Sequence, residues 1–133
     1  MKRLPAGLLI AVFSALMLIS ASALPAFAAH RGGAAIVAFS ADWCASCQSV
    51  LPIAQEVAGA NGLSVSVIDV DGKDAPHQAG EYGLSIPNSQ PPQVYLVHNG
   101  RVTLLFDGRE YNYGHDDDVR SLMLERLQAV RGR

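Results

Sequence analysis

The chain has 133 residues, of which 50% are hydrophobic and 17% are charged. This length is typical of one domain, and the composition excludes an intrinsically disordered chain. Ten basic and twelve acidic residues give a net charge of −2. Because no run or patch of lysine and arginine occurs, the sequence argues against a nucleic-acid partner.

Residues 1–28 have the layout of a secretory signal peptide. A basic tripeptide is followed by an apolar run over residues 8–19 and then by small residues. We expect cleavage at the end of this segment, with Ala23 as the second choice, which leaves residues 29–133 as one exported domain. An uncleaved membrane anchor is the alternative, because residues 7–24 are just long enough to span a bilayer. We therefore expect a periplasmic or other extracytoplasmic location, with membrane contact only if the segment is retained.

The first predicted elements alternate between strands and helices. Residues 34–39 form an apolar run that is typical of a strand buried on both faces of a sheet. Residues 44–59 carry an apolar stripe at helical spacing. Residues 63–70 alternate and are rich in β-branched side chains, which predicts a second strand. Residues 74–82 predict a short helix, which we expect Asp74 to cap.

The second half of the chain predicts a hairpin and a final helix. A proline-rich loop over residues 87–92 precedes a strand at 94–97. The Asn-Gly pair at 99–100 is a strong hairpin signal, and it leads into an antiparallel strand over 102–106. Three aspartates at 116–118 open the last helix, where acidic side chains complement the helix dipole. The order β-α-β-α-β-β-α predicts an α/β fold with a four-stranded mixed sheet and helices on both faces.

Cys44 and Cys47 are the only cysteines, and they lie at the start of the first predicted helix. A disulfide across two intervening residues closes a very short loop, so it contributes little to stability. We interpret the pair as a redox-active dithiol that forms a reversible Cys44–Cys47 disulfide. An inert disulfide and half of a metal site are the alternatives. A zinc site needs four ligands, however, and the four histidines show no paired spacing.

We expect the two thiols to have different roles. Unpaired backbone N–H groups and the dipole at a helix N-terminus stabilise a thiolate, so Cys44 should be the exposed nucleophile. Cys47, one turn further, should be buried and should resolve the mixed disulfide. Ala45 and Ser46 leave the backbone N–H groups between the cysteines free, and Trp43 should shape the rim of the site. No organic cofactor and no metal are implied, because the dithiol itself carries two electrons.

The segment FSADWCASC, with this order of elements, resembles the thioredoxin family over residues 34–131. Pro52 matches the family's helix-kinking proline, Pro92 matches its cis-proline, and Gly108 matches a glycine near the end of the last strand. The resemblance implies a thioredoxin fold, with Pro92 and Gln93 beside the disulfide. Main-chain groups on either side of Pro92 would then pair with an extended substrate segment.

Departures from the family pattern bear on proton transfer. The family's buried aspartate falls at Ala38 and its companion lysine at Val67, so we expect an apolar floor beneath Cys47. Desolvation and the lost base should slow the resolving step, unless water or Ser46 transfers the proton. The extra strand and helix that usually precede the active-site strand of thioredoxins also have no counterpart in the sequence.

The residues and the resemblance together predict a thiol–disulfide oxidoreductase that exchanges disulfides with exported protein partners. The resemblance favours reductase or isomerase work over strong oxidation. The letters ADWC also resemble the C-terminal thioredoxin-like domain of transmembrane disulfide reductases, and a membrane disulfide reductase is a candidate electron donor. We expect a monomer. The alternatives are a non-enzymatic thioredoxin-like binding module with a static disulfide, and a metal-handling dithiol protein.

Overall fold

A computed structural model describes residues 33–133. The elements in chain order are β1 (Ala35–Ser40), α1 (Ala45–Ala60), β2 (Ser64–Asp69), α2 (Ala75–Glu81), β3 (Gln93–His98), β4 (Arg101–Asp107), the short 3-10 helix η1 (Gly108–Glu110) and α3 (Asp116–Arg131). Every predicted strand and helix is present, with its ends shifted by no more than a residue, whereas η1 was not predicted. The signal peptide, its cleavage site and the family's extra N-terminal elements concern residues outside the described range.

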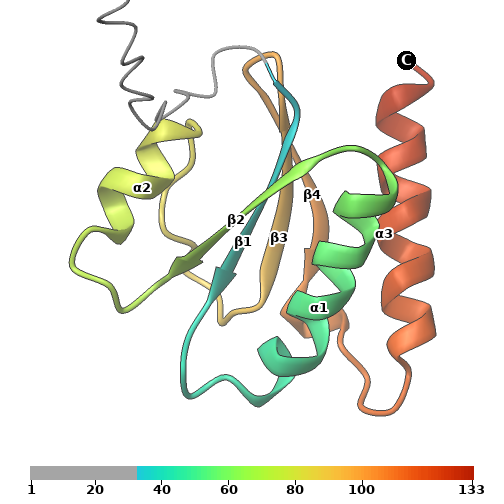
Figure 1. Cartoon of the computed structure of the whole chain (residues 1–133). Helices are drawn as coiled ribbons and strands as arrows, with labels where there is room; N and C mark the ends of the chain where they lie inside the picture. The colour runs from blue at the N-terminus through green and yellow to red at the C-terminus, as the bar shows by residue number, and fades with distance from the viewer. Residues whose placement is uncertain (1–32) are drawn as a thin grey trace, which may run out of the picture.

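The strands form one mixed sheet in the order β2-β1-β3-β4. β1 is parallel to β2 and antiparallel to β3, and β3 is antiparallel to β4. β1 therefore lies inside the sheet, which is why its first five residues are all buried. The predicted α/β fold class and mixed four-stranded sheet are confirmed (Figure 1).

Helices cover both faces of the sheet (Figure 1). Side chains alternate along β1, as expected for a strand. Ile36 and Ala38 belong to a core that also contains residues of α1 and α3. Val37 and Phe39 belong to a second core, which α2 completes on the opposite face.

The β3–β4 hairpin lies at one end of the sheet, and the loop that enters α1 lies at the other (Figure 1). β1 runs from the hairpin between β3 and β4 toward the loop that enters α1, and the chain ends near the hairpin. Asn99 and Gly100 form that hairpin turn with φ values of 51° and 72°. These positive values explain the Asn-Gly pair, because asparagine and glycine adopt this conformation most readily. We call the two regions the hairpin end and the disulfide end.

The prediction that the Asp74 side chain caps α2 is wrong. Asp74 does precede α2, but its side chain makes no capping hydrogen bond. Its ψ of 2° departs from the extended backbone that normally directs a capping side chain toward the first turn.

Within residues 33–133, no helix combines the length and the apolar character that a bilayer span requires.

Candidate functional site: the Cys44–Cys47 disulfide

The two cysteines lie where β1 passes into α1. Cys44 immediately precedes the first turn of α1, and a disulfide joins it to Cys47, with the two Cα atoms 5.3 Å apart. The backbone N–H of Cys47 donates a hydrogen bond to Cys44 Sγ at 3.2 Å. A donor of the helix N-terminus therefore points at the sulfur that we predict to be the nucleophile.

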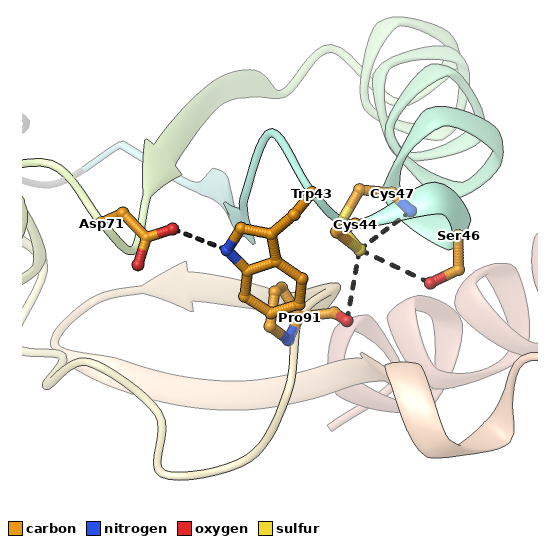
Figure 2. The surroundings of a disulfide bond; sticks show 6 residues. All are labelled: Trp43, Cys44, Ser46, Cys47, Asp71 and Pro91. Carbon is orange, nitrogen blue, oxygen red and sulfur yellow. Dashed lines mark hydrogen bonds between the residues drawn. A yellow bond between two sulfur atoms is a disulfide. The ribbon is translucent and has the colours of Figure 1, made fainter.

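Two further groups approach Cys44 Sγ (Figure 2). Ser46 Oγ lies 3.5 Å from the sulfur, and the carbonyl oxygen of Pro91 lies 3.4 Å from it. After reduction, the Ser46 hydroxyl can donate to a thiolate, whereas the Pro91 carbonyl can accept only from the protonated thiol. These two contacts favour opposite protonation states of Cys44.

Both cysteines are buried in the disulfide form. Cys44 is 5% exposed and Cys47 is 2% exposed. The prediction that Cys44 is exposed is therefore wrong for this state. The reason is tertiary, because Pro91, itself buried, comes from a loop 47 positions later and lies against Cys44.

Pro92 follows a cis peptide bond, as the resemblance to thioredoxins implied. Gly108 packs directly on this proline. A Cβ atom added to Gly108 would lie 2.9 Å from both Cδ and the carbonyl oxygen of Pro92 and 3.0 Å from its nitrogen. Only glycine allows the start of η1 to approach this closely, so Gly108 helps to hold the loop that places Pro91 against the disulfide.

Gln93 makes its contacts elsewhere. It is buried at the start of β3, its side-chain amide donates to Ser89 Oγ, and its Oε1 accepts from the Tyr95 hydroxyl. These hydrogen bonds involve neither cysteine.

Burial is the main cause that raises the pKa of Tyr95, and the negative charge of Asp107 is the second cause.

Trp43 extends away from the disulfide toward Asp71 (Figure 2). Its indole Nε1 donates to Asp71 Oδ2 at 2.7 Å, and the residue is 59% exposed. That Trp43 shapes the rim of the site stays a prediction. Ala45 is the exposed first residue of α1.

Comparison with known proteins places the chain in a family. The family model described as Thioredoxin matches residues 19–115, which is more than half of the chain. The chain belongs to the thioredoxin family. The resemblance drawn from FSADWCASC, Pro92 and Gly108 is thereby confirmed.

Individual thioredoxins are similar to parts of this chain. A thioredoxin from Pyropia yezoensis is 40% identical over 53 residues, which cover 39% of this chain and 50% of that protein. The match thus spans half the length of that relative. The solved thioredoxin of Fasciola hepatica is 20% identical, with 71% of this chain and 82% of that chain covered and a TM-score of 0.48. A solved mutant thioredoxin from Halobacterium salinarum is 23% identical, with 71% and 75% covered and a TM-score of 0.47.

The two positions that lack the thioredoxin aspartate and lysine do not form a common floor. Ala38 is fully buried in the core beneath α1 and α3. Val67 pairs with it but lies on the edge strand β2 and is 44% exposed, so the prediction of an apolar floor is wrong for Val67. The apolar neighbours that pack with the two cysteines are Ala41, Leu51 and Val70.

A charged cluster near Pro92 was missed by the sequence analysis. The buried carboxylate of Asp107 accepts from the Arg109 backbone N–H at 2.9 Å and from its guanidinium at 2.7 Å. Glu110 pairs with Arg126 at 2.6 Å. The Arg109 hydrogen bond lowers the pKa of Asp107, and the Arg126 hydrogen bond lowers the pKa of Glu110.

The spacing Asp-x-x-Glu was the overlooked signal for this cluster. Asp107 and Glu110 form a capping box around η1, in which each carboxylate accepts from the backbone at the other end. The cluster is thus a structural one. Within residues 33–133, no group of three or more histidine, cysteine, aspartate or glutamate side chains is arranged to hold a metal ion.

Proposed function

We propose that this member of the thioredoxin family is a thiol–disulfide oxidoreductase. The observation that carries the proposal is the hydrogen bond from the Cys47 backbone N–H to Cys44 Sγ at the start of α1. A helix N-terminus lowers the pKa of a thiol, and the thiolate is the reactive form. Because the pair encloses only two residues, its value as a structural staple is small.

The exchange proceeds in two displacements. The Cys44 thiolate attacks one sulfur of a partner disulfide and forms a mixed disulfide, and the other partner sulfur leaves as a thiolate. Cys47 loses its proton and attacks Cys44 Sγ, which breaks the mixed disulfide and releases the second partner sulfur. The partner gains two electrons and the Cys44–Cys47 disulfide forms. The reverse sequence oxidises a partner.

We propose that the couple works as a reductase or isomerase. A strong oxidant needs a highly stabilised reduced form. Here the Pro91 carbonyl at 3.4 Å opposes a thiolate on Cys44, while the Cys47 N–H and Ser46 support it. These opposed contacts support a moderately stabilised thiolate and hence a moderate potential.

The proposal also covers location and partners. The basic start and apolar run of residues 1–28 support export, with the domain acting outside the cytoplasm as a monomer. Its partners are then exported proteins with thiols or disulfides, and a membrane disulfide reductase would return electrons to it.

Two single variants test the proposed roles. With a protein disulfide such as insulin, Cys47→Ser should trap a mixed disulfide through Cys44, whereas Cys44→Ser should trap none and should lose turnover. Undiminished turnover by Cys44→Ser would overturn the assignment. A native disulfide that excess dithiothreitol leaves intact would support the rival, a thioredoxin-like binding module. That rival is favoured by the burial of both cysteines.

A further inference from the structure

The arginines of residues 33–133 fall into two sets. Three form ion pairs with carboxylates, at nitrogen–oxygen distances of 2.9 Å or less: Arg109, Arg120 and Arg126. The other three form no ion pair within the described part of the chain: Arg101, Arg131 and Arg133. A side chain that pairs inside the fold stabilises it, whereas an unpaired guanidinium is available to a ligand.

All three unpaired arginines line one groove at the hairpin end. The groove has a volume of about 900 Å³, and apolar side chains of Leu63 and Val130 also line it. Arg131 is held in place by Asn61, whose side-chain and backbone oxygens accept at 3.0 and 2.9 Å. Both acceptors are neutral, so the charge of Arg131 is fixed in position but not compensated.

Five aspartates lie toward the opposite end of the sheet, and Asp107 and Asp117 among them pair with Arg109 and Arg120. Asp69 ends β2, Asp107 ends β4, and three aspartates begin α3. All of these elements have those termini on the disulfide side (Figure 1). A six-residue strand is about 20 Å long, which exceeds the screening length of about 8 Å at physiological salt. An anion at the groove is therefore attracted by the arginines and is repelled only weakly by the distant aspartates.

We propose that this groove binds anionic phospholipid headgroups, so that the hairpin end docks on a membrane and the disulfide faces away from it. Guanidinium groups bind phosphate through paired hydrogen bonds. Basic side chains near a membrane are attracted to anionic lipid. Val102, which lines the groove, is 40% exposed and would contact the apolar side of the headgroup layer.

The course of the chain favours a membrane over an acidic protein as the occupant. Ala34 lines the groove, and it is only one residue from the segment that precedes the described domain. That segment contains the apolar run over residues 8–19. If residues 1–28 are retained as an anchor, which is the alternative to cleavage, this apolar run is joined to the domain through Ala34.

The test uses the full chain with a reporter at each end. Val102→Cys is labelled with an environment-sensitive nitrobenzoxadiazole dye while Cys44 and Cys47 remain oxidised. Trp43, the only tryptophan, reports on the disulfide end. Vesicles rich in phosphatidylglycerol should increase dye emission about threefold or more over pure phosphatidylcholine vesicles, with Trp43 emission unchanged. About 0.5 M salt should reverse the increase, because it screens exposed charges.

Charge variants separate the proposal from its rivals. Replacing Arg101, Arg131 and Arg133 together by glutamine should reduce the dye response about tenfold. Lys73→Gln removes a cation at the disulfide end that has no ion pair within residues 33–133, and it should change nothing. Because Arg131 contacts Asn61, the exposed Arg101→Gln alone provides a variant that should fold normally and lose part of the response.

Three results would overturn the proposal. The first is an equal dye response in neutral and anionic vesicles, and the second is a full response in the triple variant. The third is a response to soluble polyglutamate without any response to anionic vesicles, which would assign the groove to an acidic protein partner.

Discussion

The disulfide end and the hairpin end handle charge in opposite ways. Near the disulfide, Asp107 pairs with Arg109 and Glu110 pairs with Arg126. Among the described residues, the polar groups that contact Cys44 Sγ are the Cys47 N–H, the Pro91 carbonyl and the Ser46 hydroxyl, all of them uncharged. At the hairpin, three arginines surround an open groove without an ion pair inside residues 33–133. Ion pairs thus hold the loops of the disulfide end, whereas the unpaired arginines of the hairpin end are available to an anionic ligand.

This difference predicts unequal sensitivity to salt. Salt screens exposed charges but has little effect on a buried hydrogen bond. Thiolate formation at Cys44 depends on the Cys47 N–H at 3.2 Å and should therefore change little with ionic strength. Ligand binding at the groove should weaken strongly with it.

Gly108→Ala should have the largest effect, and it should destabilise the disulfide end. The added Cβ would meet the ring, nitrogen and carbonyl oxygen of Pro92 at 2.9 to 3.0 Å, and backbone cannot move aside cheaply. We expect a loss of about 1–3 kcal/mol in the free energy of unfolding, measured by urea denaturation. Exchange activity should fall too, because the Pro91 loop shifts from Cys44.

Gly80→Ala is the matched control for that change. No atom lies within 4 Å of a Cβ added to Gly80 in α2. We expect this variant to be as stable as the native protein or more stable, by about 0.5–1 kcal/mol. Equal stabilities of the two variants would show that contact with Pro92 does not constrain position 108.

Arg109→Gln should have a smaller effect, and one that depends on pH. The Arg109 hydrogen bond is the main cause of the lowered pKa of Asp107. A carboxyl whose pKa is lower in the folded state stabilises the fold above the unfolded value of about 3.9, and that stabilisation is lost as pH falls through the folded value. The variant should therefore have a lower urea midpoint at about pH 7, and the difference should shrink toward about pH 2.

Arg101→Gln is the control for this pH dependence at the hairpin end. Arg101 has no carboxylate partner among the described residues, so its replacement should leave the acid dependence of the urea midpoint unchanged. An identical pH profile for both variants would contradict the assignment of Asp107 and Arg109 as a stabilising pair.

Ser46→Ala should have the smallest effect and should act on the thiolate alone. Its Oγ lies 3.5 Å from Cys44 Sγ, and a weak hydrogen bond to the thiolate lowers the thiol pKa. The variant should raise the pKa of Cys44 and slow its alkylation at about pH 7 by about two- to fivefold. Unchanged alkylation across the pH range would exclude Ser46 from this role, and Gln48→Ala serves as an exposed control on the same helix.

The fold was largely predictable because its signals are local. The apolar run of β1, the stripe of α1 and the Asn-Gly pair each act within a few residues, and the structure places these elements within a residue of expectation. The cysteine pair and the cis-proline were predicted from the motif and the family resemblance. The capping box at Asp107 was also a local signal, but it was overlooked.

The rest depends on contacts between distant segments. Cys44 is buried because Pro91 lies against it, and sequence spacing cannot show that contact. Which arginines are paired is set by packing between elements, as when Arg120 of α3 meets Glu56 of α1. The unpaired arginines at the hairpin end become a group only after β4 and the end of α3 lie on the same groove.

The most direct test of the account is the reduction potential of the Cys44–Cys47 couple, by equilibration with glutathione followed by thiol alkylation. The opposed contacts of Pro91 and the Cys47 N–H predict a reversible couple between about −270 and −180 mV, in the range of reductases and isomerases. A value below about −300 mV would identify a structural disulfide and contradict the proposed activity.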